Sequence, residues 1–419
     1  MAEMKDSGIE WIGNIPVKWN VDKVKYHFTN YKIIPGIQSV NYNRLALTLK
    51  GVIFRDKNDG TGLQPKDFYT YQLLKKKDLV FKLIDLQNIS TSRIGLAHAT
   101  GLVSPAYIIL KSNDIVPEYA EKFFLMMWYR QIFNALGDAG VRSSLNVTDL
   151  LNVPFIVPSL DEQKKIARFI DIKCSEIDAL HTDIEKQIET LEEYKKSIIT
   201  EAVTKGLDPD VEMKDSGSVY WKDIPANWKL SDIKYLFEIV KRIAGKEGYD
   251  ILSVTQKGLK IKDISRNEGQ IAESYANYQF VYPTDFVMNH MDLLTGWVDC
   301  SKYFGVTSPD YRVFRLKDKR NSLNYYKYIM QCCYMDRIFY SLGQGVSNLG
   351  RWRLQTESFN NFQIPVPPAK EQEQIAKYLD EKCIEIENII LDKQQQLETL
   401  EQYKKSLIYE YVTGKKEVK

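Results

Sequence analysis

The segment MKDSGIEWIGNIPVKWNVDKVKYHF, residues 4–28, returns 209 positions later as MKDSGSVYWKDIPANWKLSDIKYLF, residues 213–237, with 11 of 25 positions identical. A second block, residues 157–204, returns at the same offset as residues 366–413. The chain has 419 residues, so it is close to two copies of one unit. Between the blocks the offset drifts and identities are few. The ends of the two units are therefore alike, and their middles differ.

The second block has the spacing of a long amphipathic helix. Both copies contain E-Q-x-x-I-A, K-C-x-E-I and E-T-L-E-x-Y-K-K-S. Ser159 and Glu162 form a capping-box signature, and Gly206 and Gly414 follow the last periodic residues. Apolar residues recur every seven positions, which is typical of a coiled coil, and only Lys393 interrupts the second copy. The predicted seam contains Ile170, Ile177, Ile184, Leu191, Ile198, Leu379, Ile386, Leu400 and Leu407.

The length of these helices predicts how they are used. About 44 helical residues extend about 66 Å, and neither helix can bury its apolar stripe alone. We therefore expect the two helices to pack together, antiparallel if a pseudo-twofold axis relates the units, with the two domains at opposite ends. The middles contain strand-like runs such as LVFKLIDL and YRVFRLK and short aromatic helices.

The predicted fold class is thus α+β: two mixed α/β domains joined by two long helices that form an antiparallel coiled coil, with a pseudo-twofold internal repeat. The expected boundaries are residues 1–158, 159–206, 207–367 and 368–419.

The near-neutral charge of the chain conceals opposed regions. There are 57 basic and 55 acidic residues, yet residues 161–205 have a net charge of −3 and residues 370–419 of −2. The remainder therefore has a net charge of +7. This distribution favours acidic helices that meet protein and basic domains that meet nucleic acid.

The cysteines and the hydropathy indicate the compartment. The five cysteines include no C-x-x-C pair, which indicates free thiols in a reducing cytoplasm. No apolar run approaches the roughly 18 residues needed to span a bilayer. We expect a cytoplasmic protein without a membrane segment.

Motifs of catalysis are missing from the sequence. It contains no G-x-x-x-x-G-K-[ST] phosphate loop and no N-P-P-[FYW] of adenine methyltransferases, and its four histidines are scattered. The segment Pro209-Asp210-Val-Glu212-Met-Lys214 superficially matches the acidic triplet of metal-dependent nucleases. Because Asp210 and Glu212 are two residues apart in a hinge rather than on separate strands, we interpret the segment as a polar linker. We predict no catalytic residue and no metal site.

Taken together, these motifs resemble those of a known family. DSGIEWIGNIPVKW and its repeat, a V-P or P-x-P boundary before E-Q-x-x-I-A, and the E-x-Y-K-K-S-[IL]-I helix end are similar to the specificity (S) subunit of type I restriction-modification enzymes. The resemblance covers nearly the whole chain in both halves.

The resemblance implies that each middle is a target recognition domain for one half of a bipartite DNA sequence. The helices would act as a ruler and a docking surface for two modification subunits, which bring S-adenosylmethionine and adenine methylation. Restriction subunits, which use ATP and Mg, would join later. The S subunit itself would be non-catalytic and bind no cofactor.

The unlike middles predict a DNA target that is asymmetric in its two halves. Arginine on guanine, asparagine or glutamine on adenine, and basic residues on phosphates are the expected contacts. We expect them in the Lys-Gly turns at 50–51 and 257–258, in the polar stretch 88–93, and in the glycine-rich segments DAGVRSS and GQGVSNLGRWR. The predicted DNA contacts are Lys50, Arg55, Ser92, Arg93, Arg142, Lys257, Lys260, Lys262, Gln344, Asn348, Arg351 and Arg353.

Two alternatives stay open at this point. For any one of these residues, a solvated surface charge is an equal interpretation. For the whole chain, the competing hypothesis is a stand-alone coiled-coil DNA-binding scaffold without methyltransferase partners.

Overall fold

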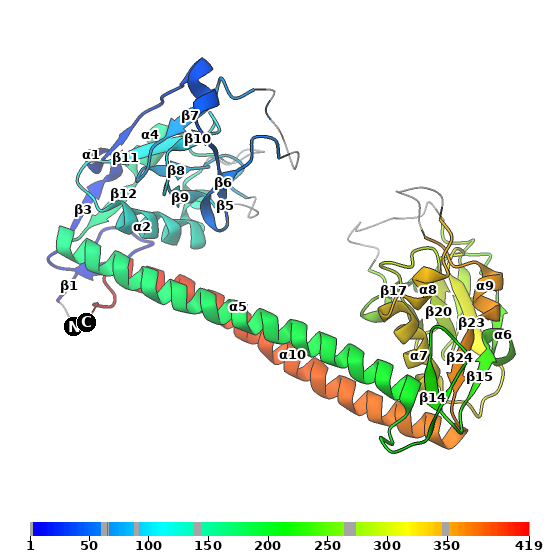
Figure 1. Cartoon of the computed structure of the whole chain (residues 1–419). Helices are drawn as coiled ribbons and strands as arrows, with labels where there is room; N and C mark the ends of the chain where they lie inside the picture. The colour runs from blue at the N-terminus through cyan, green and yellow to red at the C-terminus, as the bar shows by residue number, and fades with distance from the viewer. Residues whose placement is uncertain are drawn as a thin grey trace. The chain divides into compact units, whose positions relative to one another are not determined.

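The structure, a computed structural model, describes residues 3–59, 65, 67–87, 92–137, 144–263, 274–345 and 352–418. The chain divides into two compact units, Met1–Ile184 with Gln394–Lys419, and Glu185–Lys393. Each unit contains a mixed α/β domain and parts of two long helices, α5 (Leu160–Lys205) and α10 (Ala369–Val412) (Figure 1).

The domain of the first unit contains two four-stranded sheets. Their strand orders are β4-β11-β8-β9 and β6-β5-β10-β7, and only the β5–β10 pair is parallel. Two-stranded pairs β1-β2 and β12-β3 complete it. The strands are β1 (Met4–Asp6), β2 (Asn14–Pro16), β3 (Asn20–Lys23), β4 (Phe28–Asn30), β5 (Arg44–Thr48), β6 (Gly51–Arg55), β7 (Gln72–Leu74), β8 (Leu79–Phe81), β9 (Ile94–Leu96), β10 (Gly101–Val103), β11 (Ile108–Ser112) and β12 (Pro154–Val157). The helices are α1 (Val24–His27), η1 (Gly36–Asn41), α2 (Pro117–Tyr129), α3 (Ile132–Leu136) and α4 (Val147–Asn152).

The second unit repeats this topology. Its main sheet has the order β16-β23-β20-β21, and the pairs β18-β17 and β19-β22 are joined by a parallel bridge between Ile251 and Val306. The strands are β13 (Met213–Asp215), β14 (Asp223–Pro225), β15 (Lys229–Asp232), β16 (Phe237–Val240), β17 (Leu252–Thr255), β18 (Gly258–Ile261), β19 (Gln279–Val281), β20 (Phe286–Met288), β21 (Val298–Cys300), β22 (Gly305–Thr307), β23 (Arg312–Leu316) and β24 (Gln363–Val366). The helices are α6 (Ile233–Leu236), α7 (Leu323–Met335), α8 (Ile338–Ser341) and α9 (Thr356–Asn361).

The dissimilar middles therefore fold alike. The strand-like runs of the sequence form β8, β11, β20 and β23, which are largely buried. The aromatic segments form α2 with α3 and α7 with α8. Each of these helix pairs is separated by a residue in the left-handed region, Gln131 (φ 56°) or Arg337 (φ 55°). Apolar side chains at inward positions are enough to specify this topology, whatever their identity.

In each unit a buried tyrosine of the domain core is hydrogen-bonded to the end of a long helix. In the first unit the buried Tyr119 hydroxyl donates to the carbonyl oxygens of Ile156 and Val412, both at 3.2 Å. In the second unit Tyr325 donates to Pro365 O at 3.0 Å and Val203 O at 3.4 Å. A tyrosine hydroxyl therefore connects the domain to α10 in the first unit and to α5 in the second unit.

The starts of the long helices explain part of the repeated motif. Ser159 and Glu162 form the predicted capping box, with Ser159 N donating to Glu162 Oε2 at 3.1 Å. The indole of Trp19 donates to Glu162 Oε1 at 3.1 Å, and that of Trp228 donates to Glu371 Oε1 at 2.9 Å. The tryptophan of each I-P-x-x-W motif is therefore hydrogen-bonded to a glutamate in the first turn of a long helix.

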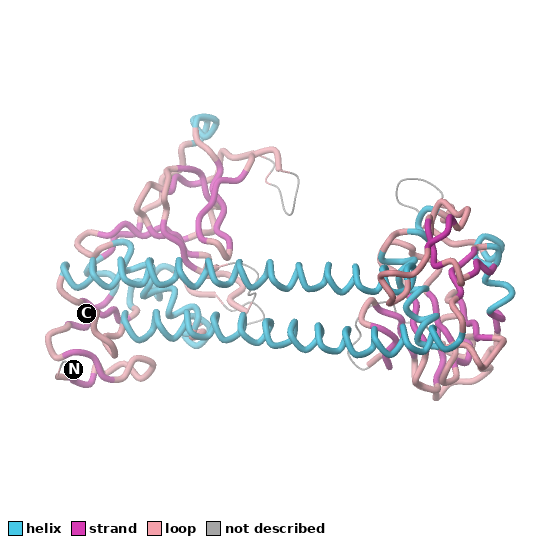
Figure 2. Tube along the Cα trace, turned by 60° about the horizontal axis from the view of Figure 1, so that its bottom comes forward, coloured by secondary structure: helices cyan, strands magenta, loops and turns pink. Residues whose placement is uncertain are grey.

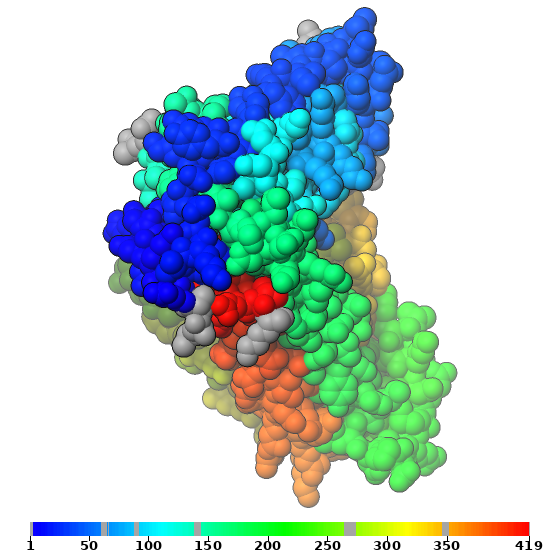
Figure 3. Space-filling model, turned by 90° about the vertical axis from the view of Figure 1, so that its left-hand side faces the viewer, coloured from blue at the N-terminus to red at the C-terminus, as the bar shows by residue number. Residues whose placement is uncertain are grey.

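The helix ends are also as the sequence predicts. Gly206 and Gly414 have φ of +79° and +69°, the left-handed geometry of a helix stop. A Cβ on Gly414 would lie 2.4 Å from Pro16 Cδ, so this position also requires the close approach that only glycine allows. In Figure 3 the C-terminal segment lies against the N-terminal segment, where Tyr409 donates to Ile12 O at 3.3 Å.

In each unit the parts of α5 and α10 lie side by side and antiparallel (Figure 2). In the first unit, Phe169 stacks near Tyr411, with ring centroids 4.4 Å apart, and Asp178 pairs with Lys404 at 2.6 Å. In the second unit, Gln187 accepts from Lys393 Nζ at 2.5 Å and Glu387 pairs with Lys195. Of the seam residues, Ile170, Ile177, Ile198, Leu379, Ile386 and Leu407 are buried, and Ile184, Leu191 and Leu400 are half-buried.

Two further expectations are checked by the structure. All five cysteines are free thiols. Within the described ranges, no helix combines the length and the apolar character that a membrane crossing requires.

Candidate nucleic-acid interface

Two hairpins with the same turn present a lysine in each unit. The turns T-x-K-G at residues 48–51 and 255–258 join β5 to β6 and β17 to β18. In both, the threonine Oγ1 donates to the glycine carbonyl (3.0 and 2.9 Å) and accepts from the lysine N–H (3.2 Å in each). The glycines have φ of +87° and +98°. Lys50 and Lys257 are therefore displayed by equivalent, preorganised turns, and both side chains are exposed.

The remaining charges of the two hairpins differ. On the second hairpin Lys260 is exposed and Lys262 half-buried. Asp299 Oδ2 accepts from Leu259 N at 2.7 Å and thereby fixes the hairpin. On the first hairpin Arg55 forms an ion pair with Asp59 at 2.8 Å, which reduces the field that this arginine offers to a phosphate.

A hollow of about 690 Å³ lies beside the second hairpin. Two basic side chains line it, Lys260 on β18 and Lys262 directly after that strand. Aromatic and amide groups from other segments complete the lining. Polar-tipped aromatic rings can stack on bases and hydrogen-bond at the same time. The lining includes the basic Lys260 and Lys262, the aromatic Tyr275, Tyr278 and Tyr311, the amide of Asn289, and the carboxylates of Asp263, Asp292 and Asp310. Sequence reasoning missed the tyrosines because they come from separate segments and no spacing marks them.

A loop next to this hollow displays two of the predicted residues. Gln344 and Arg353 form an antiparallel bridge, with N···O distances of 2.9 and 3.1 Å, and both side chains are exposed. Trp352 packs beneath: a Cβ on Gly343 or Gly345 would lie 2.2 or 2.3 Å from its ring. Gly343 and Gly345 therefore leave the space that the Trp352 ring occupies, and a side chain at either position would collide with the ring.

The hollow and this loop belong to one surface. Backbone hydrogen bonds connect Leu293 N to Trp352 O (3.2 Å) and Leu354 N to His290 O (3.0 Å), and neighbouring Asn289 and Asp292 line the hollow. Lys260, Lys262, Gln344 and Arg353 are thereby grouped around segment 289–293.

Two titratable groups beneath this surface are held in the fold. Burial, together with the positive charges of Arg312 and Arg353, lowers the pKa of His290 to about 4, so the ring is neutral. Burial lowers the pKa of Arg312 to about 10. Arg312 donates to Leu354 O and Thr356 Oγ1, both at 3.2 Å, so it supports the loop from inside.

The structure corrects the assignment of Ser92 and Arg93 as DNA contacts. They are 2% and 0% exposed. Ser92 Oγ donates to Ile94 O at 2.6 Å, and the Arg93 guanidinium donates to the carbonyls of Ile84 and Asp85 at 3.2 and 2.6 Å. Burial also lowers the pKa of Arg93. These side chains stabilise the packing of residues 92–94 against residues 82–85, so the assignment was wrong.

Three predicted residues have no described position. Arg142, Asn348 and Arg351 lie outside the described residues. Their assignment to DNA stays a prediction.

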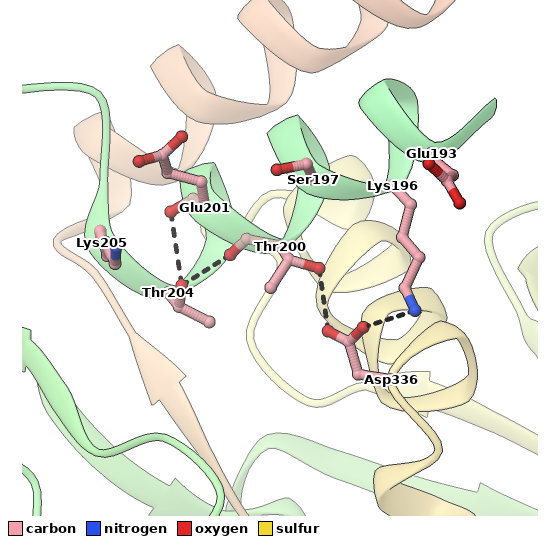
Figure 4. Close-up of a pocket in the computed structure, with 8 residues that line it drawn as sticks. All are labelled: Glu193, Lys196, Ser197, Thr200, Glu201, Thr204, Lys205 and Asp336. Atoms are coloured by element: carbon pink, nitrogen blue, oxygen red, sulfur yellow. Dashed lines mark hydrogen bonds and ion pairs between the residues drawn. The ribbon is translucent and has the colours of Figure 1, made fainter. Parts of the chain in front are cut away.

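A shallow groove of about 410 Å³ runs along the last turns of α5 (Figure 4). Three of its polar side chains are paired with one another: Asp336 accepts from Thr200 Oγ1 at 2.9 Å and forms an ion pair with Lys196 at 3.0 Å. Thr204 donates to Thr200 O at 2.6 Å.

The nuclease alternative finds no matching geometry. Asp210 and Glu212 are exposed in the loop between α5 and β13, and Lys214 Nζ donates to Ala226 O and Trp228 O at 2.7 and 2.6 Å. In the part of the chain that the structure describes, no three His, Cys, Asp or Glu residues are grouped to hold a metal ion.

Comparison with known families decides the relationship. The family model described as type I restriction modification DNA specificity domain matches residues 70–190 and 225–401, one stretch in each half of the chain. The chain belongs to the type I restriction-modification specificity family. Its function is DNA sequence recognition within a type I restriction-modification complex.

Individual relatives agree with this placement of the specificity subunit. A protein of Methanocaldococcus jannaschii, named "Putative type I restriction enzyme MjaX specificity subunit", is 24% identical over 442 residues, all of this chain and 94% of that protein. The MjaVIII specificity subunit of the same organism is 26% identical over 285 residues, 64% of this chain and 63% of that protein.

Solved structures show the same fold at low identity. A chain from a study of complex assembly and conformational transition of the type I R-M system has a TM-score of 0.68 at 12% identity, covering 96% of this chain and 99% of that chain. The HsdS subunit of Thermoanaerobacter tengcongensis has a TM-score of 0.50 at 11% identity, covering 96% and 98%.

Proposed function

We propose that each unit of the specificity subunit recognises one half of a bipartite, asymmetric DNA target. One observation supports this above all: both units display a lysine on the same T-x-K-G turn of the same topology, while the side chains around the turns differ. A lysine on a fixed turn can set the register on a phosphate without reading sequence. Unlike neighbours would then read unlike bases.

The long helices are proposed to form one antiparallel coiled coil that spaces the two recognition domains under a pseudo-twofold axis. The paired contacts found in each unit, Asp178–Lys404 and Gln187–Lys393, support an antiparallel register of this kind. The half-buried seam at Ile184, Leu191 and Leu400 leaves apolar surface for two modification subunits.

The specificity subunit is proposed to be non-catalytic and to bind no cofactor directly. S-adenosylmethionine would bind the modification subunits, and ATP and Mg the restriction subunits. The sequence contains no phosphate loop and no N-P-P-[FYW] motif, which supports this division of labour.

The test is co-expression with the cognate modification subunits, followed by mapping of methylated adenines. Wild-type protein should direct methylation to a sequence with two different halves. Replacing residues 15–155 with those of another family member should change one half only, and replacing residues 224–364 should change the other. A change in both halves from a single replacement would contradict the proposal, as would methylation without sequence preference.

A further inference from the structure

Residues 33–40 of the first unit, here called the apolar spur, expose four aliphatic side chains between β4 and β5. Ile33 and Ile34 are 39% and 52% exposed, Val40 is 67% and Ile37 is 80% exposed. Single exposed aliphatic residues are ordinary, but a cluster on one short segment marks a binding surface.

The apolar spur is firmly attached to the domain. Leu73 N donates to Ile33 O at 2.8 Å at one end, and Lys57 Nζ donates to Ser39 O and Val40 O at 3.0 and 3.3 Å at the other. Ser39 is the buried residue of the short helix η1. With Pro35 restricting the backbone, Ile37 is presented on a fixed support rather than on a loose loop.

The charge around the apolar spur indicates its partner. Residues 23–55 contain no Asp or Glu, although the whole chain has 55 acidic residues. Of their basic residues, Lys23, Lys25, Lys32 and Lys50 are exposed, whereas Arg44 is buried and Arg55 is paired with Asp59. An aliphatic cluster in a stretch that carries four exposed lysines complements a polyanion that also offers an apolar contact. Stacked base pairs of duplex DNA meet both conditions, because phosphates flank an apolar interior.

We propose that the apolar spur is a wedge that enters the half of the DNA target recognised by the first unit, with Ile37 at its tip. Isoleucine inserted at a base step unstacks the neighbouring bases and kinks the duplex. Recognition of this half then includes the ease with which its sequence is deformed. The inference rests on the proposed function of the first unit.

The second unit has a different residue at the matching place. Gly245 (φ +71°) corresponds to Gly36 (φ +56°), and Phe280 N donates to Arg242 O at 2.7 Å as Leu73 N does to Ile33 O. The residue that corresponds to Ile37 is Lys246, which is exposed. A lysine cannot enter a base stack, so the second unit meets DNA there through phosphate. The two units therefore differ in mechanism and not only in sequence preference.

The experiment uses the complex of the specificity subunit with its modification subunits and the duplex identified by methylation mapping. 2-Aminopurine placed at successive positions of each half reports unstacking as increased fluorescence. The wild-type complex should raise the fluorescence at one step of the first half.

The variants test whether Ile37 causes this increase. Ile37→Lys, which introduces the residue of the second unit, should abolish the increase and weaken target binding about ten- to a hundredfold. Ile37→Ala should have a partial effect on both. Lys246→Ala, the matched control, should keep the increase and lower the salt slope by about 1.

The outcomes separate the two levels of inference. Unchanged affinity and unchanged fluorescence in Ile37→Lys would overturn the wedge while leaving the proposed function intact. Loss of the modification subunits from the Ile37→Lys complex, with unaltered DNA stacking in wild type, would also overturn it and identify a protein interface. Failure of the wild-type complex to prefer any sequence would refute the proposed function itself. Because Ile37 lies outside the core, equal melting temperatures should show that the variants fold.

Discussion

Lys257 is one of the two predicted DNA contacts that lie on a T-x-K-G turn. It is exposed on a turn fixed by Thr255 and Gly258, and Lys50 occupies the equivalent turn of the first unit. A single ammonium group at such a place neutralises a phosphate without selecting a base.

We therefore expect Lys257→Ala to weaken binding of all sequences by a similar factor and to reduce the salt slope of log K by about 1. Filter binding or fluorescence anisotropy measures the affinity and its salt slope. A range of about 50 to 200 mM salt is suitable, because affinities that depend on phosphate contacts fall steeply across it. Lys377→Ala, on the exposed face of α10, removes the same charge away from the turn and serves as the control. A loss confined to the cognate sequence would show that Lys257 reads a base instead.

His290 makes a second residue-scale prediction, about pH. The pKa of this ring is lowered from 6.5 to about 4 by burial and by Arg312 and Arg353, so the unfolded chain binds a proton that the folded chain does not. The free energy of unfolding should therefore fall as the pH drops from about 6.5 to about 4, by at most about 1.4 kcal/mol per pH unit. Chemical denaturation across this window should show that the free energy of unfolding depends less on pH in His290→Gln than in the wild type. An equal pH dependence in the two proteins would contradict the prediction.

At the scale of elements, the helix pair carries one polar interruption. Lys393 lies between Ile390 and Leu397 in the sequence of α10 and donates to Gln187 of α5 at 2.5 Å. Polar pairs in an apolar seam fix the register at some cost in stability. This pair is formed wholly within the second unit.

Lys393→Leu should raise the melting temperature, because it adds apolar contact that stabilises the pair by about 1 kcal/mol. It should also loosen the register, which would be observed as methylated sites with more than one gap length. Lys382→Ala, which changes a lysine paired with Glu385 on the same helix, should do neither. If Lys393→Leu leaves a single gap length, the register is fixed by the apolar residues alone.

At the scale of the whole molecule, the helices set the separation of the two half-sites if they act as one spacer. Seven residues inserted in α5 after Gln187 and seven opposite them in α10 preserve the heptad and add about 10.5 Å. This equals about three base pairs at 3.4 Å each. Methylome sequencing should then find both halves unchanged and the gap wider. An unchanged gap would show that other contacts set the spacing.

The candidate interface was predictable only in part, and individual residues show why. The T-x-K-G turns could be identified because hydrogen bonds between near neighbours and a glycine of positive φ are local properties. Arg93 could not be assigned, because its polar neighbours in the sequence suggest an exposed loop. Its guanidinium instead donates to Ile84 O and Asp85 O, which only the packed loop brings together. The hollow beside Lys260 depends on tyrosines from distant segments for the same reason.

The sequence by itself determined the duplication, the two long helices with their caps and stops, and the apolar seam, because these depend on periodicity and on contacts within a few residues. The tertiary structure decided that the unlike middles share one strand order, that Ser92 and Arg93 are internal, and that Ile33, Ile34, Ile37 and Val40 are left exposed. Burial is the sum of contacts between segments far apart in the chain. A side chain is therefore assigned to the core or to the surface only when the whole domain is folded.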